Sequence, residues 1–225
     1  MVIISEKKTL SEIIIAHPET IALINRFGIT LGTGDKTIET ICNEKNLDID
    51  FFIVILNTYL NEEFFPEKIL KSFNAHTIIN YISQTYSYYT HYMLPNIERH
   101  FNLLISHSGN NNNLELMHRF FIELKEDILR IIEHDSSLWF PAIESINTNN
   151  VHSDLITQPL DSTIIEDKIN DLKNMFVIHL TGQYEVNLCH AVILSIIALE
   201  KDIKQNNRIR NRILHLICNN IAKLK

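Results

Sequence analysis

Hydrophobic residues recur along most of this chain at steps of three and four, the spacing that places them on one face of an α-helix. The clearest run extends from about residue 114 to 146. Its stripe consists of Met117, Phe121, Leu124, Ile128, Ile131, Asp135, Leu138 and Ala142. The pattern predicts a long amphipathic helix that turns this stripe, including the charged Asp135, towards a core.

Three further segments show the same periodicity, at about residues 76–105, 161–180 and 187–225. Pro95 predicts a kink in the first, and Asp161 or Ser162 can cap the second. Their inward faces are expected to consist of Ile78, Ile82, Tyr89 and Ile97, of Ile165, Ile169, Leu172, Phe176 and His179, and of Val192, Leu199, Ile203, Asn206, Ile209, Ile213 and Ile217. Four such helices with short connections favour an up-down-up-down bundle over residues 76–225.

Shorter helices are predicted ahead of this bundle. Thr9 and Asp48 stand where a side chain can cap a helix, and Gly28 can end one in the left-handed conformation. Residues 1–63 are therefore expected to form a small helical domain. A proline interrupts the helical periodicity after it, so residues 64–75 are expected to be a linker. The predicted fold class is all α.

Composition and charge exclude several classes of protein. Only five Gly and five Pro occur in 225 residues, too few for the many turns of a sheet protein, and the formal charge of -7 argues against a general nucleic-acid binder. No segment reaches the roughly 18 apolar residues of a membrane helix, and the charged first residues do not resemble a signal peptide. The separated Cys42, Cys189 and Cys218 offer neither a disulfide framework nor a C-x-x-C pair, so a cytoplasmic location is expected.

Three segments carry a family resemblance: ETIALINRFGITLGTGDKTIETIC near the N-terminus, and YSYYTHYMLPNI and LWFPAI within the predicted bundle. They resemble the RIC family, the repair-of-iron-centres proteins, and the resemblance covers nearly the whole chain. It implies a short helical N-terminal domain joined to a hemerythrin-like four-helix bundle. It also implies a non-haem di-iron centre, defence against nitric oxide and oxidative stress, and restoration of damaged iron–sulfur clusters.

The chain departs from this family pattern at both metal-related sites. Gly32 and Thr33 stand where the family usually has two adjacent cysteines, so the thiolate ligands are missing. In the bundle, the ligand positions of the family fall on Tyr86 or Ser87, Ile131, Asp135, Ile165, Asn206 and Arg210. A shift of one turn in the last helix selects Asp202 and Asn206 instead. Neither register restores a His-x-x-x-Glu pair, so we expect no catalytic residue and no resident metal.

Our hypothesis for the bundle centre is a polar pseudo-site. Asp135, Arg210, Asn206 and Tyr86 are expected to occupy the volume of the lost metal ions, with an internal salt bridge between Asp135 and Arg210. The preferred function is a diverged family member without a di-iron centre that acts as a regulatory or partner-binding protein in a stress response, with a protein partner or a second copy. The alternative is a working di-iron protein for cluster repair or for the response to nitric oxide or oxygen.

The remaining chemistry-bearing residues have simpler interpretations. No pair among the eleven histidines has the spacing of a metal site. His118 and His134 are expected to be exposed, and His179, near the end of its helix, is expected to interact with the last carbonyl groups. The basic run from Lys201 to Arg212 is expected to lie on a solvated helix face rather than on a nucleic acid.

Overall fold

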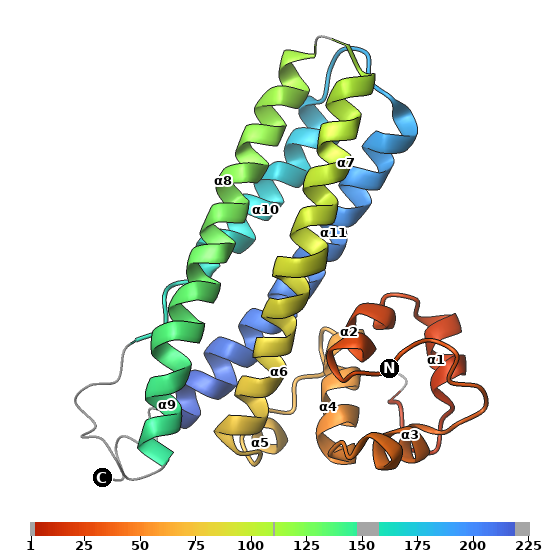
Figure 1. The fold of residues 1–225 in the computed structure, drawn as a ribbon, viewed down its shortest axis with the longest axis vertical. Coiled ribbons are helices and arrows are strands. Elements are labelled where there is room, and N and C mark those ends of the chain that lie inside the picture. The colour runs from red at the N-terminus through yellow and green to blue at the C-terminus, as the bar shows by residue number, and fades with distance from the viewer. Residues whose placement is uncertain (1–2, 110, 148–157, 219–225) are drawn as a thin grey trace. The chain divides into compact units, whose positions relative to one another are not determined.

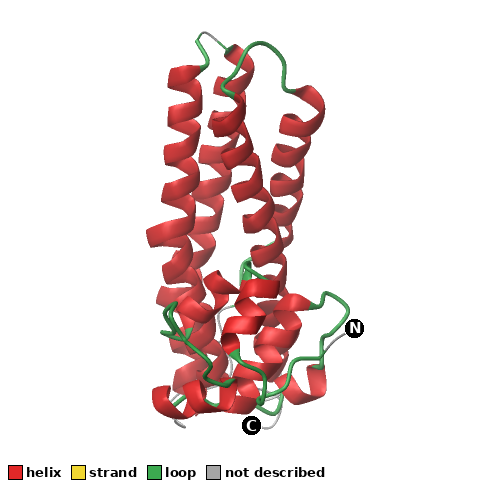
Figure 2. Ribbon diagram, turned by 90° about the vertical axis from the view of Figure 1, so that its right-hand side faces the viewer, coloured by secondary structure: helices red, strands yellow, loops and turns green. Residues whose placement is uncertain are grey.

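The computed structural model describes residues 3–109, 111–147 and 158–218. Within these ranges the chain forms helices joined by loops and turns, without a β-strand (Figure 2). The predicted all-α class is confirmed. The described residues form two compact units: one combines the chain up to Thr85 with the segment from Arg208 onward, and the other runs from Tyr86 to Asn207. Among the described helices, none is both long and apolar enough to cross a membrane.

The first unit is built largely from short helices. They are α1 (Leu10–Ala16), α2 (Thr20–Arg26), α3 (Ile38–Lys45), α4 (Ile49–Leu60), α5 (Glu67–Leu70) and most of α6 (Ala75–Tyr88). The side chains of Thr9, Thr37 and Asp48 each accept the backbone N–H three residues later and so begin α1, α3 and α4. Gly28 follows α2 with a φ of 67°, in the left-handed region. The predicted caps at Thr9 and Asp48 and the predicted stop at Gly28 are confirmed.

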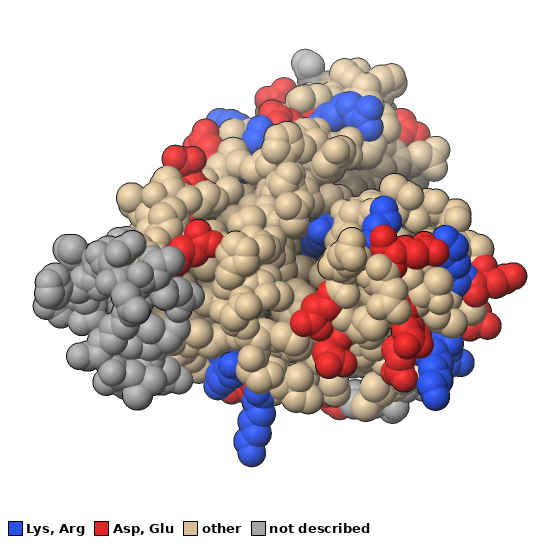
Figure 3. Space-filling model, turned by 60° about the horizontal axis from the view of Figure 1, so that its bottom comes forward, with Lys and Arg blue, Asp and Glu red and all other residues tan. Residues whose placement is uncertain are grey.

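Residues 64–75, predicted to be a linker, contain α5 and are fastened to the last helix of the chain. The guanidinium carbons of Arg208 and Arg212 lie 4.3 and 4.7 Å from the centre of the Phe65 ring, and Arg212 also pairs with Glu67. Arg208 and Arg212 therefore contact other side chains of the first unit, although the sequence predicted that this basic run lies on a solvated helix face. The face drawn in Figure 3 likewise shows basic side chains among acidic ones rather than a large basic patch.

The second unit is a bundle of long helices. It contains η1 (Tyr89–Met93), α7 (Leu94–His107), α8 (Asn112–His134), η2 (Asp135–Trp139), α9 (Phe140–Asn147), α10 (Thr163–Asn174), η4 (Met175–His179) and α11 (Val186–Ile209), which continues as η5 (Arg210–Leu214) in the first unit. The helices α7, α8, α10 and α11 lie side by side, each antiparallel to the one before it (Figure 1). Most of the predicted inward residues are buried, among them Ile97, Phe121, Leu124, Ile169, Leu172, Val192 and Leu199.

The elements named η are wide π turns, and two of them precede a proline. The N–H of Leu94 donates to the carbonyl oxygen of Tyr89, and the N–H of Phe140 donates to that of Asp135, five residues back in both cases. Pro95 and Pro141 come next. A proline has no N–H for the carbonyl four residues earlier, and its ring collides with that carbonyl, so widening the preceding turn relieves the clash.

A π turn holds one residue more than an α turn, and it shifts which residues face inward. The stripe of α8 was expected to continue through Leu138 and Ala142. Instead Leu138 is 52% exposed, Trp139 is fully buried, and Ile143 takes the next inward place. The prediction for Leu138 is therefore wrong. The expected inward place of His179 is wrong as well, because the π turn η4 ends at this residue and its side chain is exposed.

Candidate functional site

A polar pair lies buried in the second unit where a bundle would otherwise be apolar. Tyr86, in the last turn of α6, donates a hydrogen bond of 2.6 Å from its Oη to Oδ2 of Asp135, the first residue of η2. Asp135 is fully buried and Tyr86 is 4% exposed. The hydrogen bond offsets part of the cost of burying two polar groups.

Aromatic side chains hold this pair in place. The ring of Tyr86 stacks on Phe140, with centroids 5.9 Å apart and an angle of 11° between the planes, and Trp139 packs against Phe140 at 5.6 Å. The π turn η2 supplies both Asp135 at its start and Trp139 at its end. On the outer side, Nδ1 of the partly exposed His134 lies 3.5 Å from Oδ1 of Asp135. The sequence reasoning missed this contact, for which only adjacency in the chain gave a signal.

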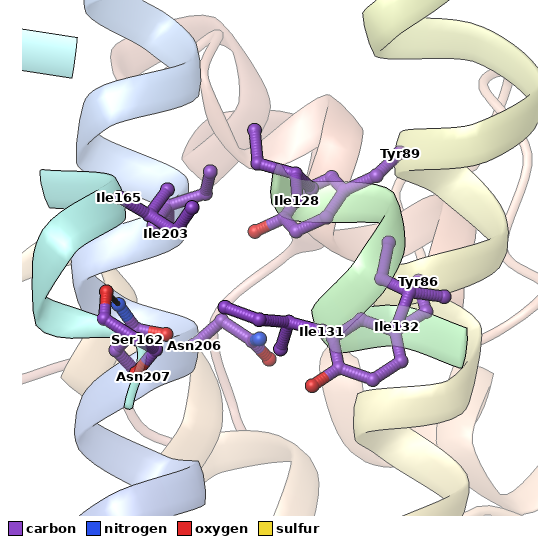
Figure 4. Close-up of a pocket in the computed structure, with 10 residues that line it drawn as sticks. All are labelled: Tyr86, Tyr89, Ile128, Ile131, Ile132, Ser162, Ile165, Ile203, Asn206 and Asn207. Atoms are coloured by element: carbon purple, nitrogen blue, oxygen red, sulfur yellow. Dashed lines mark hydrogen bonds between the residues drawn. The ribbon is translucent and has the colours of Figure 1, made fainter. Parts of the chain in front are cut away.

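A small cavity of about 20 Å³ lies among these helices (Figure 4). Its lining consists of Tyr86, Tyr89, Ile128, Ile131, Ile132, Ser162, Ile165, Ile203, Asn206 and Asn207. Figure 4 shows the two tyrosines pointing into the space from one side and Asn206 from the other. A volume of this size admits one water molecule, and Oδ1 of Asn206 is buried there without a hydrogen-bond partner among the described residues. A single water fits this space better than a pair of metal ions with their ligands.

Neighbouring polar residues tie α11 to α10. Asn207 Nδ2 donates to Oε1 of Glu166 at 2.7 Å and to the carbonyl oxygen of Ser162 at 3.4 Å. Lys173 pairs with Glu200 at 2.8 Å further along the same two helices. These contacts fix the helices that carry two of the predicted ligand positions.

Four of the predicted ligand positions line the cavity, whereas Asp135 is not part of the lining and instead accepts the hydrogen bond from Tyr86. Tyr86, rather than the exposed Ser87, takes the inward position on α6. Ile131 and Ile165 line the cavity from α8 and α10 as buried aliphatic side chains, and Asn206 lines it from α11. None of these side chains except Tyr86 and Asn206 offers a polar atom.

Two further predicted ligand positions on the last long helix, Asp202 and Arg210, are also buried. Asp202 is 1% exposed, and Arg210 at the start of η5 is fully buried, with Nη1 donating to Oδ1 of Asn211 at 2.8 Å. The structure thus corrects the assignment of Arg210 to a solvated basic run. Arg210 belongs to the first unit and Asp135 to the second, so the salt bridge between them stays a prediction.

The turn around Gly32 and Thr33, which the sequence resemblance singled out, is largely exposed and rich in glycine. Gly32 and Gly34 adopt φ values of 88° and 59°, which side chains other than glycine rarely adopt. Thr33 lies between them and is half-buried. Neither Gly32 nor Thr33 offers a ligand for a soft metal.

Histidines and cysteines do not assemble a metal centre in the part of the chain that the structure describes, where no group of three or more His, Cys, Asp or Glu side chains could hold an ion. The expected exposure of His118 is wrong: its ring packs 5.4 Å from that of Phe101, and burial lowers its pKa. The thiols of Cys42, Cys189 and Cys218 are free and buried, and burial raises the pKa of each. Raised thiol pKa values leave little of the reactive thiolate at neutral pH.

Comparison with protein-family models gives no match, and no curated protein matches the chain significantly.

Proposed function

We propose that this chain is a diverged relative of the RIC family whose hemerythrin-like bundle holds no di-iron centre. It acts through its surfaces as a regulatory or partner-binding protein in the response to nitrosative and oxidative stress. The segments around Leu94-Pro95 and Phe140-Pro141 carry the family resemblance within the bundle.

One observation supports the absence of iron most strongly. Four of the positions that the resemblance assigns to ligands line one cavity. Ile131 and Ile165 contribute only aliphatic groups to this lining, and Tyr86 donates a hydrogen bond to Asp135. Iron needs several imidazole and carboxylate ligands, which these residues do not supply.

Metal analysis of the purified full chain, expressed with added iron, tests the proposal. We expect a colourless protein with far less than one iron per chain and a melting temperature that a chelator does not change. About two iron ions per chain, with visible absorption, would favour the di-iron alternative.

A gain-of-ligand experiment tests whether these positions correspond to the metal site. The double variant Ile131→His/Ile165→His places two imidazoles on the cavity lining, one of them a helical turn before Asp135, and we expect it to bind Co²⁺ with visible absorption that the native chain lacks. The matched control is Ser87→His, which adds an imidazole at an exposed position on α6. Equal Co²⁺ affinity in the double variant and the control would show that the assignment of ligand positions is incorrect.

The stress role is tested in cells. Deleting the gene should sensitise them to a nitric-oxide donor, and expression of the native chain should restore growth. The altered side chain of Tyr86→Phe lies in the bundle centre. If the surfaces carry the function, this variant should restore growth as well as the native chain does. Unchanged sensitivity after deletion would remove the stress-response part of the proposal.

A further inference from the structure

The first half of α11 has apolar side chains on its outer face as well as on its inner face. Residues 186–199 contain no Asp, Glu, Lys or Arg. Val192 and Ile196 are buried in the bundle, whereas Leu194 and Ile197 on the opposite side are 64% and 43% exposed. Apolar side chains on both faces of a helix are normally covered on both sides, and in the described part of the chain Leu194 and Ile197 remain exposed on the outer face of α11.

Two more exposed apolar residues lie at the same level of the bundle. Val177 and Ile178 in η4 are 72% and 66% exposed. Because α10 and α11 are antiparallel and Lys173 pairs with Glu200, residues about one turn beyond Lys173 lie opposite the first half of α11. We define the outer apolar face as Val177, Ile178, Val186, Leu194 and Ile197.

We propose that a second copy of this chain covers the outer apolar face, with the two α11 helices packed antiparallel across a two-fold axis near Leu194. The exposed parts of these five side chains amount to roughly 500 Å², a large share of the roughly 800 Å² that each partner contributes to a standard interface. The largest apolar patch on a typical monomer is of about this size and is often functional.

The arrangement of the stripe suits a symmetric contact. Leu194 is the middle member of the series Val186, His190, Leu194, Ile197 and Lys201, which follows helical spacing; the first four are exposed and Lys201 is partly buried. In an antiparallel pair centred on Leu194, the other members face one another reciprocally, as a two-fold interface requires. The aliphatic stem of Lys201 would then cover Val186 of the other copy while its amino group stays in water.

Charge opposes self-association less strongly at a contact that carries no acidic side chain. Each copy carries a formal charge of -7, so two copies repel each other, and the repulsion between contacting residues is smallest where the contact carries no acidic side chain. The proposal goes beyond the function argued above, and it does not depend on whether the bundle holds iron.

Sedimentation velocity of the full chain between about 1 and 100 µM tests the proposal, since standard interfaces give dissociation constants in or below this range. We expect a species of twice the 26.2 kDa chain mass. Leu194→Glu should raise the dissociation constant by about thirtyfold or more, the effect of losing one central contact residue, because it also places like charges together at the axis. The matched control Leu116→Glu alters a leucine of similar exposure on α8 and should leave the dimer intact.

A second variant does not rely on weakening the interface. Leu194→Cys should form a disulfide-linked dimer on mild oxidation, because the two positions face each other across the axis, whereas Leu116→Cys should not. A native chain that stays monomeric throughout the concentration range would overturn the proposal. So would a dimer that Leu116→Glu dissociates as readily as Leu194→Glu, since another face would then hold it together.

Discussion

The hydrogen bond between Tyr86 and Asp135 is expected to contribute measurably to stability. In Asp135→Ala, the buried Tyr86 hydroxyl loses its acceptor 2.6 Å away, which costs about 1–3 kcal/mol. Removing the carboxyl group also leaves a void of roughly 40 Å³, worth about 1 kcal/mol more. The total, about 2–4 kcal/mol, should lower the melting temperature by roughly 5–15 °C for a chain of this size.

Tyr86→Phe removes only the hydroxyl and leaves Asp135 without this donor, so a loss of about 1–3 kcal/mol is expected. In the double variant Tyr86→Phe/Asp135→Ala neither partner is left behind, and the loss should be smaller than the sum of the single losses by about 1 kcal/mol or more. Urea unfolding followed by circular dichroism measures all three free energies of unfolding.

Ser87→Ala provides the control, because Ser87 is the next residue on the same helix but is exposed. Its free energy of unfolding should stay within about 0.5 kcal/mol of the native value. If Asp135→Ala unfolds at the same urea concentration as Ser87→Ala, the buried pair contributes nothing and the argument for a polar pseudo-site fails.

Three further outcomes are expected. Burial lowers the pKa of His118 below its ordinary 6.5, so the unfolded chain binds the proton more readily than the folded chain. The stability that this histidine contributes above pH 6.5 is therefore lost as the pH falls through its pKa in the folded state. Melting curves should show a smaller loss of stability on acidification for His118→Gln than for the native chain. Burial raises the thiol pKa values of Cys42 to about 11 and Cys218 to about 12, so a thiol reagent at pH 8 should label them only in denaturant, and rapid labelling of the native chain would contradict this. Phe65→Ala removes the ring that two guanidinium groups contact, and it should lower the free energy of unfolding in urea by about 2 kcal/mol. Arg212→Ala leaves the ring in place and should lower this free energy by less.

Features set by a few neighbouring residues could be predicted from the sequence. Thr9 and Asp48 cap helices because their side chains reach a backbone N–H only three residues away, and Gly28 ends α2 because its own φ is positive. The inward stripes before the prolines were predictable for the same reason, since α-helical spacing alone decides which residues share a face.

Contacts between distant residues could not be predicted in this way. Tyr86 and Asp135 are 49 residues apart, and the spacing of residues within each helix does not report which side chain of another helix they meet. The packing of His118 on Phe101 depends on how two helices approach each other, which periodicity within one helix does not report.

The prolines explain both the largest error and the geometry of the site. A kink, as predicted for Pro95, and a π turn, as found before both prolines, relieve the same clash, and the choice depends on which side chains each would bury. The π turn brings Trp139 inward in place of Leu138. The larger apolar area of Trp139 is thereby buried beside Phe140, which in turn supports the ring of Tyr86. The burial of Trp139, which supports the polar pair through Phe140, thus depends on tertiary packing and on the π turn that precedes Pro141.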